Sequence, residues 1–293
     1  MSDVKLFGRN TPEGDPATWQ HVLTYPIDRL GIVELAVAEV VWPSLTSRGT
    51  WPLELIRWFY DQGKRNNGEG MQSCVGESFS ELMTIKCWLY LESVAVKYRR
   101  PKPRSLYTTP LFYSPWLYHK SQDKDGDPRT TPEADNGAFI WAAAQVMKEM
   151  GHVPVKYNRP PIPEDQMTPE LQFRIGNYYW SNTLGGIKIG LALGPGVGGW
   201  PWLDAFMWPR AREVKINGVA RTEYWIGEQD NWGGIMGGHA VCICGVSDSR
   251  EGILIVGSWG LGFPMVWVSY KAVERLLQMQ SEFCFIVNRE PVR

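Results

Sequence analysis

The stretch SCVGESFSELMTIKCWLYLESVAVKY, residues 73–98, decides the fold of this chain. Its apolar side chains recur at helical spacing, and the glycine-rich segment NNGEGMQ, residues 66–72, comes directly before it. This pattern predicts a long helix that begins at Cys74. A thiol at that end of a helix meets backbone N–H groups and the positive end of the helix dipole, which favour the thiolate. Cys74 is therefore the first candidate nucleophile, and the small residues near it are expected to leave its sulfur accessible.

A thiol nucleophile needs a base, and the chain has only four histidines. His239 follows Gly237 and Gly238 and opens the apolar segment AVCIC, residues 240–244, which has the composition of a strand. An imidazole there is fixed on a rigid element, while the glycines leave room for substrate or for an opposing lobe. A structural histidine at a strand edge is the alternative interpretation. We predict that Cys74 and His239 form the reactive pair.

The first half of the chain is mostly helical in pattern, and the second half is rich in strands. Helices are expected at WPLELIRWFYDQ (51–62) and AFIWAAAQVMKEM (138–150), with an irregular stretch at 101–115. Beyond Pro160 the pattern predicts short strands among Gly, Pro and Asn. These segments are IKIGLAL (187–193), EVKINGVARTEYWI (213–226), HAVCICGV (239–246), GILIVGSW (252–259), MVWVSY (265–270) and FCFIVN (283–288).

Helices first and strands later indicate an α+β protein with two packed lobes and a cleft between them. Residues 1–50 are expected to form an amino-terminal extension packed on the main fold, with a strand within 32–42. Residues 51–155 would form a helical lobe that carries the nucleophile. Residues 156–293 would form a β-rich lobe that carries the histidine.

Two segments resemble the papain-like cysteine peptidases. QSCVGESFSEL (72–82) is similar to the nucleophile helix of that family, although Val75 replaces the usual aromatic residue, and GGHAVCICGVSD (237–248) closely resembles its histidine strand. GSWG (257–260), WVSY (267–270) and DNGAFIWAAAQVMKEMGHVPV (135–155) extend the resemblance, and bacterial and phage members are the most similar. The resemblance implies a helical lobe, an antiparallel sheet or barrel lobe, and an active-site cleft between the two.

In that family a thiolate attacks a peptide carbonyl, and an imidazolium protonates the leaving amine. The resemblance thus implies that Cys74 attacks a peptide or protein substrate and that His239 moves the proton. It also implies that Asn136 and Gly137 line the cleft and that Trp259 shields the histidine from water. No cofactor is implied.

The chain departs from the family at the residue that orients the imidazole. Gly257 stands where the family has an asparagine, so the usual side-chain hydrogen bond to the ring has no donor or acceptor there. Ser258, Asp248 or a backbone carbonyl are the candidate replacements.

A second departure concerns the donor to the oxyanion. The family's glutamine lies six residues before the nucleophile, where this chain has Gly68, so Asn67 and Gln72 are the candidates. Two such losses favour an alternative hypothesis, a catalytically degenerate module that serves as a structural or binding component of a larger assembly such as a phage particle.

The composition excludes several classes of protein. With 30 basic and 31 acidic residues among 293, and no long block of one sign, a nucleic-acid partner is not expected. The five cysteines do not form the framework of a small secreted domain, and no apolar run matches a signal peptide or a membrane span. We expect a cytoplasmic protein without membrane contact, with association with a virion as the alternative location.

Two further motifs carry no cofactor chemistry. GPGVGG (194–199) lacks the Lys and Ser/Thr of a phosphate loop and predicts a tight connection. Asp123, Asp125 and Asp127 lack the remaining ligands of a calcium loop and predict a solvated acidic turn, so no metal site is expected.

Overall fold

The computed structural model describes residues 39–41, 59–62, 72–97, 111–131, 134–155, 166–170, 173–216 and 218–287. The helices within these ranges are α3 (Cys74–Lys97), α4 (Ser114–Asp125), α5 (Ile140–Glu149), α6 (Leu184–Leu193) and α7 (Tyr270–Leu277), with short 3-10 turns η7 (Asp204–Met207) and η8 (Gly260–Gly262). The strands are β1 (Glu39–Val41), β2 (Leu111–Phe112), β3 (Pro154–Val155), β4 (Asn177–Trp180), β5 (Gly196–Leu203), β6 (Arg210–Ile216), β7 (Val219–Ile226), β8 (Ile235–Ser247), β9 (Gly252–Val256), β10 (Val266–Ser269) and β11 (Glu282–Val287).

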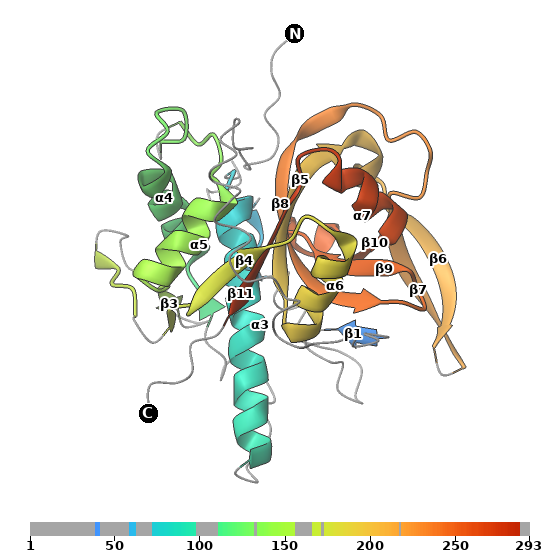
Figure 1. The fold of residues 1–293 in the computed structure, drawn as a ribbon, viewed down its shortest axis with the longest axis horizontal. Helices are drawn as coiled ribbons and strands as arrows, with labels where there is room; N and C mark the ends of the chain where they lie inside the picture. Colours follow the sequence, from blue (N-terminus) through green and yellow to red (C-terminus); the bar gives the residue numbers. More distant parts are fainter. Residues whose placement is uncertain are drawn as a thin grey trace.

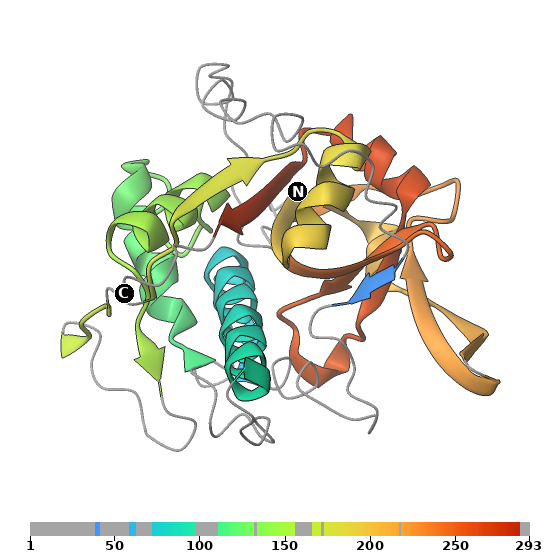
Figure 2. The ribbon, with the colours of Figure 1, turned by 60° about the horizontal axis from the view of Figure 1, so that its bottom comes forward.

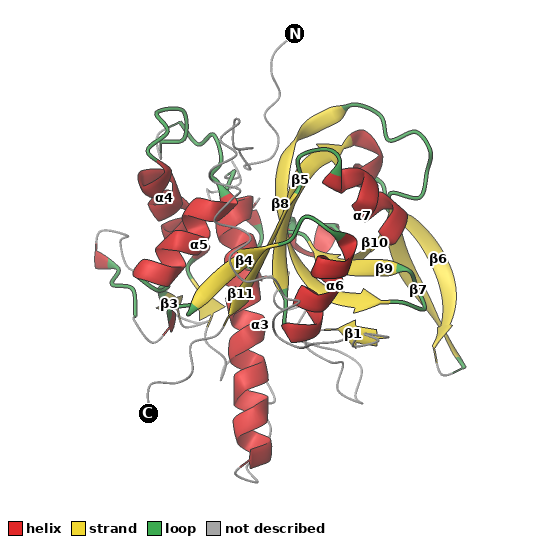
Figure 3. Cartoon of the chain, viewed as in Figure 1, coloured by secondary structure: helices red, strands yellow, loops and turns green. Residues whose placement is uncertain are grey.

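The chain forms two lobes with α3 between them. Helices α4 and α5 pack on one side of α3, and the large sheet lies on its other side, where α3 contacts β8 (Figure 1; Figure 3). The turned view keeps α3 between the lobes (Figure 2). The α+β, two-lobed architecture expected from the order of helices and strands is confirmed.

The large sheet has the strand order β4-β11-β5-β8-β9-β10-β7-β6. Its neighbours are antiparallel except for β10 and β7, which run parallel. Strand β1 adds to the far end of β8, with Glu39 opposite Ser247 and Val41 opposite Gly245. Helices α6 and α7 cover the face of the sheet that points away from α3 (Figure 1).

Two hydrophobic cores result from this arrangement. One lies between α3, the helical lobe and the sheet, and the other lies between the sheet and helices α6 and α7. Cys242 and Cys244 alternate along β8, so both thiols point into the first core, where they are fully buried. They are structural hydrophobes, as expected from their spacing.

The segment GPGVGG is not a tight connection, and this prediction is wrong. Its last four residues, Gly196–Gly199, form the first half of β5, which pairs with both β8 and β11. The glycines make room for rings: a Cβ on Gly196 would lie 2.6 Å from the Phe285 ring, and one on Gly198 would lie 2.3 Å from the Trp200 ring. Their lack of side chains therefore serves close packing rather than a turn.

The segment IKIGLAL is also predicted wrongly, because it is helical and belongs to α6. Thr183 caps this helix, since its side chain accepts a hydrogen bond from the Gly186 backbone N–H at 3.1 Å. Ile187 and Leu191, four residues apart, both point into the second core. Tertiary packing and the cap outweigh the strand-like composition.

Much of the predicted helix at 51–62 and of the irregular stretch at 101–115 falls outside the described residues. No helix in the described part of the chain has the length and apolar character needed to cross a membrane.

Candidate active site

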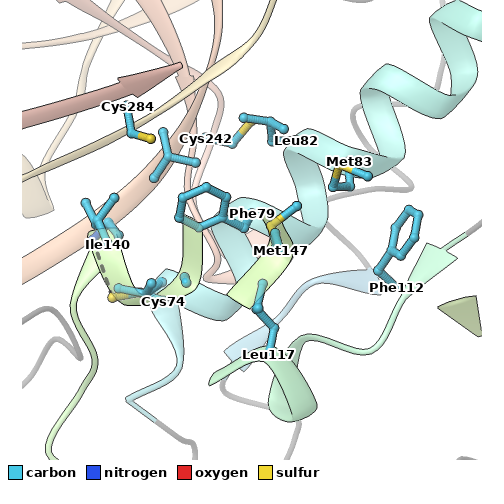
Figure 4. Close-up of a cluster of buried hydrophobic side chains, with 14 of the residues drawn as sticks. Cys74, Phe79, Leu82, Met83, Phe112, Leu117, Ile140, Met147, Cys242 and Cys284 are labelled. Atoms are coloured by element: carbon cyan, nitrogen blue, oxygen red, sulfur yellow. Dashed lines mark hydrogen bonds between the residues drawn. The ribbon is translucent and has the colours of Figure 1, made fainter. Parts of the chain in front are cut away.

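Cys74 and the histidine strand meet where α3 begins. Cys74 is the first residue of α3, and its Sγ accepts a hydrogen bond from the backbone N–H of Ala240 at 3.4 Å. Ala240 directly follows His239 in β8, so residues 166 positions apart in sequence come into contact. Figure 4 shows Cys74 at the border of the apolar cluster that includes Phe79 and Ile140, with this bond drawn as a dashed line.

The thiol is not accessible in this structure, contrary to the sequence-based expectation. Both Cys74 and His239 are 0% exposed. The reason is packing: Cys74 belongs to the first core together with Val75, Ala138 and Ile140. A substrate can reach Sγ only if atoms that now cover it move.

The His239 ring lies in an aromatic enclosure. Trp259 stacks on it with 4.2 Å between centroids and 4° between planes, and Trp202 meets it edge-on at 4.9 Å. Burial lowers the pKa of His239 to about 3, because an imidazolium in this enclosure would lose its hydration. In this closed geometry the imidazole is therefore neutral at ordinary pH.

Ser258 directs its hydroxyl toward Gln62. Its Oγ donates to Gln62 Oε1 at 3.0 Å, and the Gln62 backbone N–H donates to the Ser258 carbonyl at 2.9 Å. Asp61 forms an isolated antiparallel bridge with Trp259. Gln62 is consequently bonded to Ser258, the residue directly before Trp259, whose ring stacks on His239. Gln62 is only 6% exposed.

Sequence reasoning missed Gln62. Counting six residues back from Cys74 led to Gly68, whereas Gln62 lies further back, and the segment between them is longer than that count assumed. Gln62 Oε1 accepts from Ser258, so any hydrogen bond that this side chain donates comes from its Nε2 group. No local pattern marks Gln62, because it is identified by its contact with Ser258, 196 residues away.

Asp248 is not near the imidazole, and its candidacy as the orienting residue is corrected here. It follows the end of β8, and at about 3.3 Å per residue it lies on the order of 20 Å or more along the strand from His239. Its carboxylate instead binds Lys188 at 2.6 Å and accepts from the Tyr270 hydroxyl at 2.7 Å.

Gly257 leaves space next to the Trp259 ring. A Cβ built on it would come 3.4 Å from the Phe263 ring and 3.9 Å from the Trp259 ring, which are ordinary contacts. No side chain from this position can orient His239, but the backbone and its surroundings would accept one.

The predicted cleft-lining loop lies beside α4. Asn136 donates its side-chain N–H to the Arg129 carbonyl at 2.9 Å, and the Gly137 backbone N–H donates to the Tyr118 hydroxyl at 3.1 Å. Gln72 donates its backbone N–H to Asp135 at 3.1 Å, and Asn67 lies outside the described residues.

A shallow depression of about 610 Å³ opens beside the residues that precede His239. It is lined by Pro201, Ile235, Gly237, Gly238 and the segment 278–280.

The described residues contain no group of three His, Cys, Asp or Glu side chains that could hold a metal ion. Hydrogen bonds within the acidic turn engage the Asp125 carboxylate, which accepts from the Asp127 backbone N–H and from the Thr130 hydroxyl.

No family model matches this chain, and no curated protein matches it. Solved structures do match. Xylellain, a cysteine protease from Xylella fastidiosa, aligns with a TM-score of 0.58 and 17% identity over 98% of each chain. The ragweed pollen cysteine protease Amb a 11 in its proform aligns with a TM-score of 0.56 and 13% identity over 90% of this chain and 69% of that chain. The recombinant stem bromelain precursor aligns with a TM-score of 0.50 and 10% identity over 92% of this chain and 75% of that chain. The chain has the papain-like fold.

Proposed function

We propose that this chain is a cysteine peptidase that hydrolyses peptide bonds, with Cys74 as nucleophile and His239 as the group that moves the proton. The observation that carries the proposal is the contact between the first residue of α3 and β8, in which Cys74 Sγ accepts the N–H of the residue after His239. A thiol at a helix amino terminus and an imidazole on a buried strand are the two groups that acyl transfer to sulfur requires.

The chemistry proceeds through a thioester. The Cys74 thiolate adds to the peptide carbonyl carbon, and the C–N bond breaks as the His239 imidazolium gives its proton to the leaving amine. Water, deprotonated by the now neutral imidazole, then adds to the thioester, and the acid product and the thiol are released. Proton transfer returns the site to its starting state without a cofactor.

Gln62 is the donor that we propose for the oxyanion. Its side-chain oxygen is occupied by Ser258, so the amide N–H₂ is the end that can bind a developing negative charge. The depression beside Gly237 and Gly238 provides room for a side chain of an extended peptide substrate.

The closed geometry must open during turnover. Burial holds the pKa of His239 near 3, so the imidazolium form requires water or substrate polar groups to reach the ring. The structure is therefore proposed to represent a resting state in which the reactive pair is covered.

A non-catalytic module within a larger assembly, such as a phage particle, is the second candidate. It is favoured by the complete burial of Cys74 and His239 and by Gly257 at the position of the orienting residue. In that case the aromatic enclosure would serve only the stability of the fold.

Hydrolysis of a fluorogenic peptide library separates the two candidates. Cys74→Ala should lower kcat by at least about 10³-fold, and His239→Ala should do the same. Cys87→Ala, a half-buried cysteine on the same helix, is the matched control and should retain the wild-type rate.

Alkylation by iodoacetamide, mapped by mass spectrometry, provides the second measurement. A peptidase should be inactivated as Cys74 is modified, with a pH profile that changes in His239→Ala. A folded wild type that cleaves no peptide and whose Cys74 is not modified would support the non-catalytic module instead.

A further inference from the structure

The carboxylate of Asp135 joins two segments at the approach to Cys74. Its Oδ1 accepts the Gln72 backbone N–H at 3.1 Å, and Oδ2 lies 3.3 Å from the same nitrogen. Oδ1 also accepts the Tyr118 hydroxyl at 2.7 Å. Gln72 lies two residues before Cys74, and Tyr118 belongs to α4, so one side chain connects the nucleophile segment to the helical lobe.

Tyr118 extends this connection to the predicted cleft-lining loop. While its hydroxyl donates to Asp135, it accepts the Gly137 backbone N–H at 3.1 Å. The Gly137 carbonyl in turn accepts from Gln122 Nε2 at 3.0 Å. Both the N–H and the carbonyl of Gly137, in the loop that carries Asp135, are thus hydrogen-bonded to side chains of α4.

Asp135 itself adopts an unusual backbone conformation. Its φ is 44°, in the left-handed region that costs a residue with a side chain roughly 1 kcal/mol or more. The conformation is maintained because its N–H donates to the Thr131 carbonyl at 3.2 Å and its carboxylate has two donors. Strain that is kept by several bonds indicates a position where the direction of the side chain matters.

The first turn of α3, which follows Gln72, packs closely against α4. A Cβ on Gly76 would lie 2.5 Å from the Ser114 carbonyl oxygen and 3.1 Å from the Tyr118 nitrogen, so the first turn of α3 touches the backbone of α4. Burial, together with the hydrogen bond to Asp135, raises the pKa of Tyr118 well above its usual value, so the hydroxyl stays protonated and donates to that carboxylate.

We propose that Asp135 is a positioning residue, whose bonds to Gln72 and Tyr118 fix the segment that presents Cys74 relative to the facing loop. The inference rests on the proposed peptidase function and adds a residue to it. Asp135 acts through Gln72 and Tyr118 and has no role in the proton transfers.

Two substitutions test this role. Asp135→Ala removes both acceptors and should lower kcat between about 10- and 100-fold with little change in KM, because the nucleophile is displaced rather than the substrate site. Asp135→Asn keeps an amide oxygen at the Oδ1 position and should recover kcat to within about threefold of wild type. Asp123→Ala, which removes an exposed carboxylate of α4, is the matched control and should have no effect.

Amide hydrogen exchange, measured on peptides that contain Gln72, reports the hydrogen bond between Gln72 and Asp135 and does not depend on activity. The Gln72 amide should exchange faster in Asp135→Ala and at the wild-type rate in Asp135→Asn. Wild-type kcat in Asp135→Ala, or unchanged exchange at Gln72, would overturn this inference. If the wild-type protein has no activity but the variants show the predicted exchange pattern, the proposed function is overturned, while the role of Asp135 in holding the Gln72 segment is supported.

Discussion

At the residue scale, Gly257 is the position at which the proposed site can be improved. The Phe263 and Trp259 rings surround the position of a new Cβ at ordinary contact distance. Gly257 is not among the glycines with a left-handed φ, so an added Cβ here meets neither a steric nor a backbone barrier.

Gly257→Asn should therefore raise kcat/KM by about tenfold, because an amide next to the aromatic enclosure can hydrogen-bond to the His239 ring and fix its orientation. Gly257→Ala fills the same space without the amide and is the control. Peptide hydrolysis and thermal unfolding would be measured for both. Equal rates for the two variants would mean that another group already orients the ring.

The sequence singled out Cys74 and His239, the pair proposed to react, but not the bond between Gln62 and Ser258. The positions of Cys74 at the start of α3 and of His239 in β8 could be predicted because a helix start and a glycine-flanked strand are local patterns. Gln62 and Ser258 could not be paired from sequence, because they lie 196 residues apart and meet only in the tertiary structure. Asp248 was misplaced for the opposite reason: nearness in sequence to His239 becomes a long separation along an extended strand.

At the scale of elements, α6 and β5 depend on glycines that make room for one phenylalanine. Phe285 of β11 is 1% exposed, and a Cβ on Gly190 of α6 would lie 2.7 Å from its ring. On the other side, Gly196 of β5 approaches the same ring. Composition alone assigned a strand to α6 and a connection to β5, since local propensity does not record the partner that fills the space.

Gly190→Ala should lower the free energy of unfolding by about 1–2 kcal/mol. Alanine gains about 1 kcal/mol in helix propensity, but its methyl group overlaps a buried ring that has no space to retreat, which costs about 2–3 kcal/mol. Chemical denaturation measures the difference. Gly185→Ala, in the same helix with nothing within 4 Å of the new Cβ, should instead stabilise by about 0.5 kcal/mol. A stabilised Gly190→Ala would mean that Phe285 can move.

At the scale of the whole molecule, each lobe contains a histidine that is buried and neutral. Burial lowers the pKa of His152 and of His239 to about 3. The bonds of His152 fix its protonation: Nδ1 accepts the Val153 N–H at 2.9 Å, so Nε2 carries the proton and donates to Ser80 Oγ at 2.8 Å. Ser80 passes the bond to the Gly76 carbonyl in the first turn of α3. The start of α3 is thus linked to a neutral imidazole in the helical lobe.

Stability should therefore decrease as the pH falls from 6.5 toward 3. In this range the unfolded chain binds a proton at each of these histidines and the folded chain does not, so each contributes a slope of up to about 1.4 kcal/mol per pH unit. Urea unfolding at pH 7, 6, 5 and 4.5 measures the slope. His152→Gln and His239→Ala should each reduce it by about one proton, and the reductions should add, because the two rings lie in different lobes. An unchanged slope in both variants would mean that these histidines take up protons in the folded state, and that the aromatic enclosure around His239 is already open to water.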